Sequence, residues 1–434
     1  MAASRKVAVA SVCLVLSLIL LQFYVTSLHK ELRAKILRAQ ITTFMSGLIS
    51  LACWYLYRRL LAENHTVLAC PSRLLWTLWK SVVICFLLCA QVTYATNLFF
   101  ITTDPQWIAM VCYICLGTLI QLVCCLLVCD LIEIGLRVLR RGRQYQQNQI
   151  SLKAQQTRTV VAILIALMLS ARGLTVGLSP PPLKKVTIPM TKLPRSFDGL
   201  TVIQLSDIHL GPTVGRSRLQ DVVDRAMATK PDVIVIAGDL VDSVVKKLGE
   251  AAEPLKQLQA PYGVYFITGN HEYYTGDVDA WFDKLRSLNV QVLHNEKAIL
   301  QNHKQPEDTI CLAGVDDNTA DSFGYDGHGE HLDKALGSCD PDQPIILLAH
   351  KPSCAKRALQ SKYNVNLVLS GHTHGGQLFP MIIAAYLVNP YYVGLYRVSD
   401  HAHVYVSPGT FYWGIPMRVF TSMEITHITL QATW

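Results

Sequence analysis

Hydrophobic residues follow two different patterns along this chain of 434 residues. In the first part they form long apolar segments, each near or above the length that crosses the hydrocarbon core of a bilayer. This pattern predicts five membrane-spanning helices, at residues 7–27, 41–57, 81–101, 107–133 and 159–178. Arg5 and Lys6 precede the first segment, but its apolar core is long for a signal peptide and no small-residue cleavage pattern follows, so we interpret it as a signal anchor.

Beyond residue 178, the hydrophobic residues fall in short runs separated by amphipathic stretches. Runs such as 201–206 and 232–237 are rich in β-branched residues and predict buried strands, whereas stretches such as 216–229 and 278–288 predict helices. Strands that alternate with helices are typical of a layered α/β fold. The prolines at 180–182 stop the last membrane helix. We therefore predict a membrane region at 1–178, a Pro-rich linker at 179–185 and a folded domain at 186–434.

Five of the strand-like runs end in residue types that bind metals. The five blocks are Asp207-Ile208-His209, Gly238-Asp239, Gly269-Asn270-His271-Glu272, Ala349-His350 and Gly371-His372-Thr373-His374. Sites collect at the carboxyl ends of strands in open α/β sheets, so the five ends can converge on one edge. Asp and Asn oxygens together with imidazoles suit a centre of two cations, which activates water and clamps a phosphoryl oxygen.

The five blocks, in this order, resemble the calcineurin-like metallophosphoesterase superfamily, whose signatures are D-x-H, G-D-x-x-D, G-N-H-E, a single His and G-H-T-H. The resemblance covers roughly residues 185–434. It implies a four-layer α/β/β/α sandwich, in which two mixed sheets carry helices on both outer faces. It also implies two divalent cations, and the oxygen and imidazole ligands suit Mn, Fe or Zn.

The resemblance further implies a role for each residue of the blocks. The ligands of one cation are Asp207, His209 and His374, and those of the other are Asn270, His350 and His372. Asp239 bridges the two, as a carboxylate can. His271 is not a ligand and serves as general acid near the leaving group, since imidazole titrates near neutrality. The nucleophile is then a metal-bound hydroxide that attacks phosphorus in line.

These observations predict a membrane-anchored phosphoesterase, with phosphodiester, pyrophosphate or lipid phosphoester substrates favoured because the active site would lie at the membrane surface. Two alternatives stay open: a non-catalytic membrane receptor or scaffold that keeps the fold, and a transporter with a regulatory hydrolase domain. A transport pathway usually carries ionisable residues inside the membrane. Asp130, Glu133 and Arg172 qualify, but all lie near span ends, so anchoring is the simpler interpretation.

Charge differs sharply between the two parts. Residues 1–183 carry 17 Lys and Arg against 5 Asp and Glu, a net +12, and the remainder carries 22 against 26, a net −4, which together give the total of +8. The basic excess lies in loops between spans, so it indicates membrane topology rather than nucleic-acid binding.

The loop charges also predict an orientation. One side would carry 12 basic residues: Arg5, Lys6, Arg58, Arg59, Arg73, Lys80, Arg137, Arg140, Arg141, Arg143, Lys153 and Arg158. The other would carry Lys30, Arg33, Lys35 and Arg38. The positive-inside rule puts the N-terminus in the cytosol, and five spans then place the enzyme domain in a lumen or outside the cell. The sequon Asn64-His65-Thr66 would face the cytosol and stay unused.

Several residues near the blocks favour ordinary structural interpretations. We expect Asp242 to fix its loop by hydrogen bonds, Glu272 to orient an imidazole, and Arg418 to be solvated rather than to contact a substrate phosphate. Histidines outside the blocks are interpreted as surface or core residues: His294, His303, His328, His331, His401, His403 and His427. Four tyrosines either line an acceptor pocket or form a packed cluster: Tyr386, Tyr391, Tyr392 and Tyr396.

Cysteine gives little information about the compartment. Ten of the 13 cysteines lie in residues 1–183, mostly within spans. The domain has only Cys311, Cys339 and Cys354, an odd number that argues against a disulfide framework while leaving one bridge open.

Overall fold

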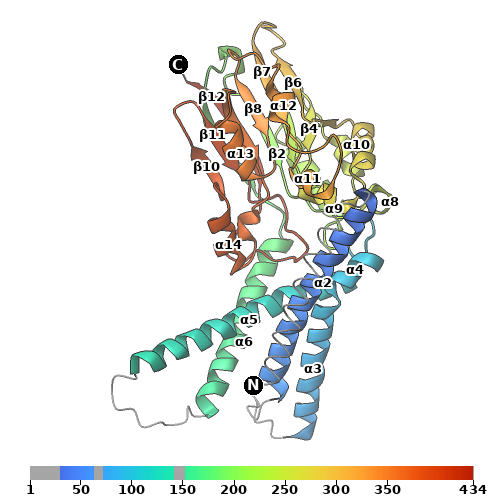
Figure 1. The fold of residues 1–434 in the computed structure, drawn as a ribbon, viewed down its shortest axis with the longest axis vertical. Coiled ribbons are helices and arrows are strands. Elements are labelled where there is room, and N and C mark those ends of the chain that lie inside the picture. The colour runs from blue at the N-terminus through green and yellow to red at the C-terminus, as the bar shows by residue number, and fades with distance from the viewer. Residues whose placement is uncertain (1–29, 63–71, 141–151, 434) are drawn as a thin grey trace.

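A computed structural model describes residues 30–62, 72–140 and 152–433 of the chain. It has two parts, a bundle of long helices and an α/β domain that sits at one end of the bundle (Figure 1).

The helices of the first part are α2 (Lys30–Tyr57), a π-helical turn (Arg58–Ala62), α3 (Arg73–Gln91), α4 (Thr93–Phe99), α5 (Trp107–Arg140) and α6 (Leu152–Leu178). Four stretches are long and apolar enough to cross a membrane, namely Lys35–Leu61, Arg73–Gln91, Trp107–Leu136 and Gln156–Leu178. Four of the five predicted spans therefore have a helical counterpart among the described residues. The first predicted span, 7–27, lies outside those residues.

The third predicted span, 81–101, is wrong in its limits. Its helix, α3, begins at Arg73, where the Ser72 hydroxyl accepts a hydrogen bond from the Leu75 N–H, and it ends at Gln91. The helix thus includes Lys80, which precedes the predicted span, and the Lys80 ammonium lies over the Trp76 ring, 4.8 Å from its centroid. Long basic side chains at helix ends can reach polar surroundings in this way without ending the helix.

The domain contains two six-stranded sheets. The first has the order β1-β12-β2-β3-β4-β5, with β1 (Leu183–Thr191), β12 (Ile425–Thr433), β2 (Thr201–Leu205), β3 (Val233–Ala237), β4 (Val264–Ile267) and β5 (Gln291–Val292). The second has the order β10-β11-β9-β8-β7-β6, with β10 (Gly394–Arg397), β11 (His403–Val406), β9 (Val365–Ser370), β8 (Ile345–Leu348), β7 (Thr309–Gly314) and β6 (Glu296–Gln301). Both sheets are mixed, since each combines parallel and antiparallel pairs.

Helices cover the outer faces of both sheets, and this arrangement confirms the predicted four-layer sandwich. One core cluster lies between the sheets and includes Ile267 from β4 and Leu369 from β9. A second packs α7 (Arg216–Met227) and α10 (Val278–Ser287) against the first sheet, and a third packs α12 (Leu332–Leu336) and α13 (Pro352–Leu359) against the second. These helices are amphipathic and bury one stripe each, as apolar residues three and four positions apart should.

The remaining helices of the domain are short. They are α8 (Val245–Leu248), α9 (Asn270–Thr275), α11 (Thr319–Phe323) and α14 (Met381–Val388), with 3₁₀ turns at Arg195–Phe197, Glu253–Gln257 and His374–Gly376.

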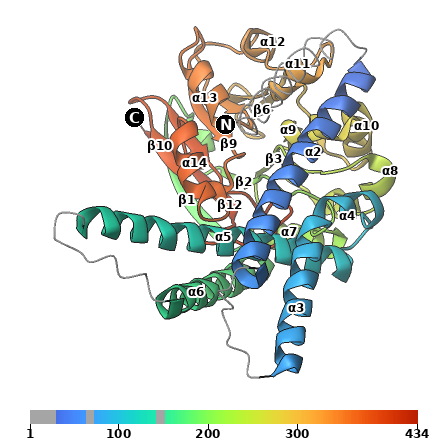
Figure 2. The same cartoon turned by 60° about the horizontal axis from the view of Figure 1, so that its bottom comes forward.

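The junction between the two parts is short and tightly packed. Strand β1 already begins at Leu183, paired with Ile425, so part of the predicted 179–185 linker belongs to a sheet. In addition, the Gln121 side chain of α5 donates a hydrogen bond to the Phe379 carbonyl at 2.8 Å, and the Arg418 N–H donates to the Gly173 carbonyl of α6 at 3.0 Å. The domain is therefore held directly against α5 and α6 (Figure 2).

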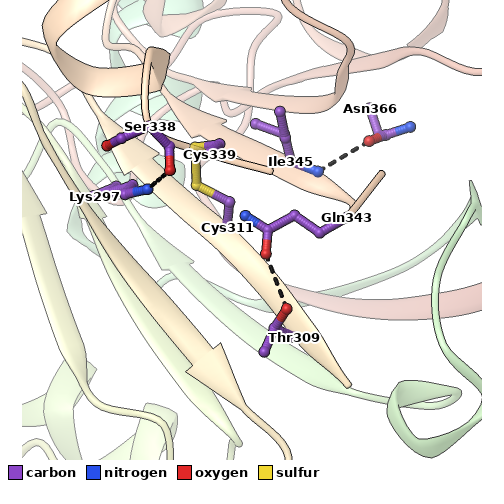
Figure 3. The surroundings of a disulfide bond; sticks show 8 residues. All are labelled: Lys297, Thr309, Cys311, Ser338, Cys339, Gln343, Ile345 and Asn366. Carbon is purple, nitrogen blue, oxygen red and sulfur yellow. Dashed lines mark hydrogen bonds between the residues drawn. A yellow bond between two sulfur atoms is a disulfide. The ribbon is translucent and has the colours of Figure 1, made fainter. Parts of the chain in front are cut away.

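One disulfide crosses the second sheet's outer layer (Figure 3). It joins Cys311 on β7 to Cys339, which follows α12, while Cys354 is free and buried. The odd number of cysteines thus reflects one bridge and one buried thiol, the possibility that the sequence left open.

Candidate metal centre

All five predicted blocks follow the carboxyl ends of strands, four of them in loops and turns and the third, which contains Asn270, in the first turn of α9. Strands β2, β3 and β4 are parallel neighbours in one sheet, and β8 and β9 are parallel neighbours in the other. Since parallel strands end at the same edge of a sheet, their loops meet there. The structure consequently brings every predicted site residue to one edge of the sandwich.

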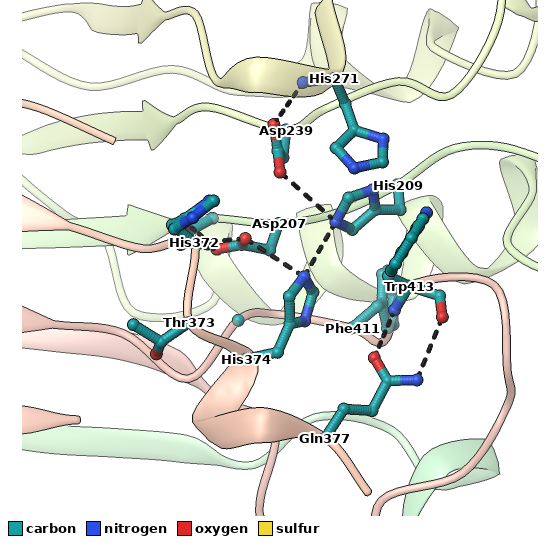
Figure 4. Close-up of polar contacts among 12 residues, drawn as sticks. Asp207, His209, Asp239, His271, His372, Thr373, His374, Gln377, Phe411 and Trp413 are labelled. Atoms are coloured by element: carbon teal, nitrogen blue, oxygen red, sulfur yellow. Dashed lines mark hydrogen bonds and ion pairs between the residues drawn. The ribbon is translucent and has the colours of Figure 1, made fainter. Parts of the chain in front are cut away.

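Asp207, His209 and His374 form the first group of candidate ligands (Figure 4). The His374 Nε2 lies 3.3 Å from the Asp207 Oδ1, and the His209 Nε2 lies 3.0 Å from the His374 Nε2. Two imidazole nitrogens that face each other at this distance, beside a carboxylate, form the kind of donor set that a divalent cation uses.

Asp239, His350 and His372 form the second group. The His350 Nε2 lies 3.2 Å from the Asp239 Oδ2, and the same Oδ2 lies 3.8 Å from the His209 Nε2 of the first group. The Asp239 carboxylate thus stands between the two groups. Asn270 is buried on the adjacent loop.

The backbone at this edge is strained. Five of the seven predicted ligands have a positive φ: Asp207 (53°), His209 (51°), Asp239 (52°), His372 (72°) and His374 (50°). Non-glycine residues adopt this conformation at a cost, and such residues cluster where a site fixes the backbone. The loop backbones therefore adopt unfavourable conformations that direct these side chains toward one another.

Hydrogen bonds fix the orientation of the imidazoles. The His350 Nδ1 donates to the Ala237 carbonyl at 2.8 Å, which turns its Nε2 toward the Asp239 carboxylate. Asp242 Oδ1 lies 2.9 Å from the His209 Nδ1 and 2.8 Å from the His271 Nδ1. One carboxylate thus orients two rings, and the expectation that Asp242 makes hydrogen bonds agrees with this geometry.

Glu272 does not orient an imidazole, so that interpretation was wrong. Its carboxylate is fully buried and accepts hydrogen bonds from the backbone N–H groups of Gly269, Asp239, Leu240 and Val241. It holds the β3 loop against the β4 loop. A residue of this kind positions the ligands by fixing the backbone that carries them.

The charges of the centre stabilise one another. Burial opposes ionisation of Asp239, but the positive charges of His350 and His271 outweigh it and hold the pKa of this carboxyl well below its usual range. Burial likewise opposes protonation of His271, but Asp239 and Asp242 together raise the pKa of His271 to about 9. Asp207 behaves differently, since burial and the nearby Asp239 raise its pKa.

Arg418 is buried rather than solvated, which corrects the prediction for this residue. Only 1% of it is exposed, and its guanidinium donates to the carbonyls of His374, Pro408 and Phe411. It ties the loop that carries His374 to the loop after β11. Burial lowers the pKa of Arg418 to about 9. Its sequence position, far from every block, gave no sign of this contact.

Trp413 and Gln377 were missed by the sequence analysis. The Trp413 ring is partly exposed and lies edge-on to His271, with centroids 5.2 Å apart, at the entrance of the centre. Gln377 holds this loop, since its side chain accepts from the Trp413 N–H and donates to the Trp413 and Ile415 carbonyls (Figure 4). A lone Trp outside any block carried no signal in the sequence.

Most of the other histidines and tyrosines lie away from the centre. His294 and His328 share the buried Asp316 at 2.6 and 3.5 Å, and Tyr273 hydrogen-bonds to His328, so these residues form a separate polar group whose donor atoms could also hold a cation. The four tyrosines pack on one another, with Tyr391 and Tyr396 ring centroids 5.2 Å apart and Tyr386 and Tyr392 centroids 5.8 Å apart. This packing favours the cluster interpretation over an acceptor pocket.

Comparison with known proteins is consistent with this centre. A profile of the calcineurin-like phosphoesterase family matches residues 200–376. The chain is 43% identical over 432 residues to a Danio rerio protein described as "Transmembrane protein with metallophosphoesterase domain", over 99% of this chain and 98% of that protein. A Bos taurus protein of the same description is 43% identical over 433 residues, covering 98% of this chain and 97% of its own length. A Helicobacter pylori protein described as an uncharacterized metallophosphoesterase is 36% identical over 262 residues, or 60% of this chain and 66% of that protein.

Proposed function

Because this chain belongs to the calcineurin-like metallophosphoesterase family and is a phosphoric ester hydrolase of the membrane, we propose that it hydrolyses phosphodiester, pyrophosphate or lipid phosphoester bonds at the membrane surface. The family uses divalent metal ions, and we propose Mn, Fe or Zn, which suit a mixed oxygen and imidazole shell.

Buried polar atoms without partners support the fit of two cations. The Asn270 Oδ1 is buried and makes no hydrogen bond with the described residues, and the buried His350 Nε2 has only its approach to the Asp239 carboxylate at 3.2 Å. A lone pair that is buried in this way is costly unless something binds it. A cation held by each group would satisfy these atoms, and it would separate the imidazole nitrogens of His209 and His374.

We assign the ligands accordingly. Asp207, His209 and His374 would hold one cation, and Asn270, His350 and His372 would hold the other. Asp239 would bridge them, because its carboxylate lies between the groups and carries a negative charge that Asn270 lacks. When bound, the two cations would supply a water of lowered pKa as the nucleophile and would neutralise charge on the phosphoryl oxygens.

His271 would act as the general acid. Its backbone N–H donates to the Asp239 Oδ1 at 2.8 Å, so the ring is fixed relative to the proposed bridge. Asp242 accepts from its Nδ1, which leaves the Nε2 to give a proton to the leaving-group oxygen. Trp413, beside this ring, would shield it from solvent and form one wall of the leaving-group side.

We also propose that the enzyme domain lies in a lumen or outside the cell. The four basic residues at the start of α2 lie on the domain side, whereas the basic ends of α3, α5 and α6 and the Arg58-Arg59 turn after α2 lie away from the domain (Figure 1). The positive-inside rule assigns those ends to the cytosol. The Cys311–Cys339 bridge supports the same side, since disulfides persist mainly in oxidising compartments.

The observation that carries the proposal is the pair of ligand groups, joined by Asp239, on convergent strand ends. Its test is Asp239→Asn in the purified full-length chain loaded with Mn. Bound metal and turnover of a phosphodiester, monoester and lipid phosphate panel should fall together, because the shared position loses its charge. Asp340→Asn, at an exposed turn, is the control. An Asp239→Asn protein that keeps two ions and full activity would contradict the assignment.

A further inference from the structure

Helix α14 presents an apolar surface that the described part of the chain leaves uncovered. None of its eight residues is buried, and Leu387 and Val388 are 74% and 76% exposed. Phe420, on a neighbouring loop, is 75% exposed. Exposed apolar side chains that gather in one place mark an interaction surface. Because α14 also carries no charged residue, its partner must be apolar.

The position of α14 identifies the membrane as that partner. It begins directly after Phe379, whose carbonyl accepts the hydrogen bond from Gln121 of α5. Leu378, just before it, packs in a cluster with Leu169 of α6. In both views α14 lies at the end of the domain that faces α5 and α6 (Figures 1 and 2). The apolar surface is therefore continuous with the helices that enter the bilayer.

A cleft of about 500 Å³ opens beside α14, between α6 and the domain. Leu169, Arg172 and Val176 of α6 line one side of it, and Tyr392 and Phe420 line the other. Arg172 lies six residues before the end of α6, or about 9 Å along the helix, which is near headgroup depth. Arg418 also lines the cleft, but its guanidinium is buried and donates to backbone carbonyls, so Arg172 is the exposed cation. Apolar side chains around an exposed cation at this depth match a phospholipid, whose phosphate is charged and whose chains are not.

The charge of Arg172 has no carboxylate partner among the described residues, where its side chain contacts only the Thr175 hydroxyl at 3.4 Å. Asp130 and Glu133, the other two ionisable residues that the sequence placed near span ends, are paired with Arg59 and Arg158. An ionisable residue on a spanning helix marks a functional position when nothing neutralises it. The cleft supplies the space for an anion.

We propose that α14, Phe420 and the Arg172 cleft form a lipid-binding face of this domain. The apolar side chains of α14 and Phe420 enter the leaflet that α5 and α6 cross, as interfacial helices do. The Arg172 guanidinium holds the phosphate of an anionic phospholipid in the cleft. Its consequence for catalysis rests on the proposed function: a substrate that is itself a lipid phosphoester can reach the metal centre without leaving the membrane.

The first test places a photoreactive phenylalanine analogue at position 387 of the full chain in phosphatidylcholine nanodiscs. Illumination should give a protein–lipid adduct, detected by mass. The matched control is position 299, which also holds an exposed apolar residue but lies on β6, away from the spans (Figure 1). A position-387 protein with no more lipid adduct than the position-299 protein would overturn the membrane contact of α14.

The second test compares Arg172→Gln with Arg286→Gln, an exposed arginine on α10. Retention of phosphatidylglycerol by protein taken from mixed nanodiscs is measured by native mass spectrometry. The Arg172 variant should retain about fivefold less, the factor expected for one basic group at an anionic lipid surface, while the Arg286 variant should match the parent. Equal retention by all three proteins would remove Arg172 from the lipid site.

Neither lipid measurement needs turnover, so both can be repeated with Asp239→Asn. If the parent chain hydrolyses none of the phosphoesters while lipid adducts and retention persist in the parent and in Asp239→Asn, the proposed function fails and the lipid-binding face stands. In an active protein, Leu387→Asp should lower hydrolysis of a bilayer-embedded phosphoester and leave a soluble diester unaffected. A parallel loss on both substrates would contradict the membrane route for the substrate.

Discussion

At the scale of single residues, the centre depends on groups that fix the ligands as much as on the ligands themselves. Asp242 orients two imidazoles, Glu272 accepts four backbone N–H groups, and Arg418 ties the His374 loop to its neighbours. Such supporting partners set the tautomer and direction of metal-binding histidines. Replacement of a proposed ligand should therefore remove metal. Replacement of His271 should not, because Asp242 orients its ring but the ring is not a proposed ligand.

His271→Ala tests this separation. We expect the metal content to stay near that of the parent and kcat to fall by roughly 10²–10⁴, the usual contribution of a general acid. Metal analysis and steady-state kinetics on the same preparation measure both quantities. His401→Ala, in an exposed turn, should change neither. Loss of metal from the His271 variant would instead make this residue a ligand and require a new assignment of the shell.

The sequence identified the residues that we propose as ligands but not the residues that support them, and the reason is physical. Each proposed ligand follows a strand within two to four residues, so a local pattern of apolar run, glycine and His, Asn or Asp reveals it. Arg418 acts across loops that only the complete fold brings together, and it is 44 residues from His374. Its burial depends on three carbonyls whose positions no local pattern encodes. Trp413 was missed for the same reason.

At the scale of elements, the sheets were more predictable than the helix ends. The strand-like runs before the metal-binding blocks became β2, β3, β4, β8 and β9. The predicted 81–101 span differs from its helix at both limits, because Ser72 capping and the backbone of Val92, with ψ near 2°, set the ends of α3. Hydropathy locates a span, but caps decide where its helix begins and ends.

The disulfide is the element-scale feature with the most direct test. It closes a loop with a sequence separation of 28, which should stabilise the domain by about 3 kcal/mol. Cys339→Ser should therefore lower the Tm of the purified chain by roughly 6–12 °C. Ser338→Ala is the adjacent control. Treatment of the parent with reductant should reproduce the variant's Tm, and an unchanged Tm in both experiments would mean that the bridge does not form in the protein.

At the scale of the whole molecule, the arrangement of the helices agrees with the predicted distribution of charge. Arg58 and Arg59 follow α2, Arg73 begins α3, and Arg140 ends α5, all at the end of the bundle opposite the domain (Figure 1). Lys30 begins α2 at the domain end. The described helices thus separate a strongly basic end from the end that carries the metal centre. Which compartment each end faces determines whether the substrate is cytosolic.

Engineered glycosylation sites decide the orientation, and the structure selects where to place them. The loop after β6 is unsuitable at Asn302, which is buried and donates a hydrogen bond to the Ser196 carbonyl. Lys304→Asn with Pro306→Thr instead creates a sequon in a fully exposed turn at the far end of the domain. Because only lumenal sites meet the transferase, this sequon should be glycosylated and shift the mobility of the chain until the glycan is removed. Ile150→Thr completes a sequon at Asn148, between α5 and α6, and this sequon should stay unmodified.

The reverse pattern, with Asn148 modified and position 304 bare, would place the domain in the cytosol. In that case one fewer or one more segment crosses the bilayer than the five predicted, with the 7–27 segment the first to be reconsidered, and the metal centre would act on cytosolic substrates with the same residues.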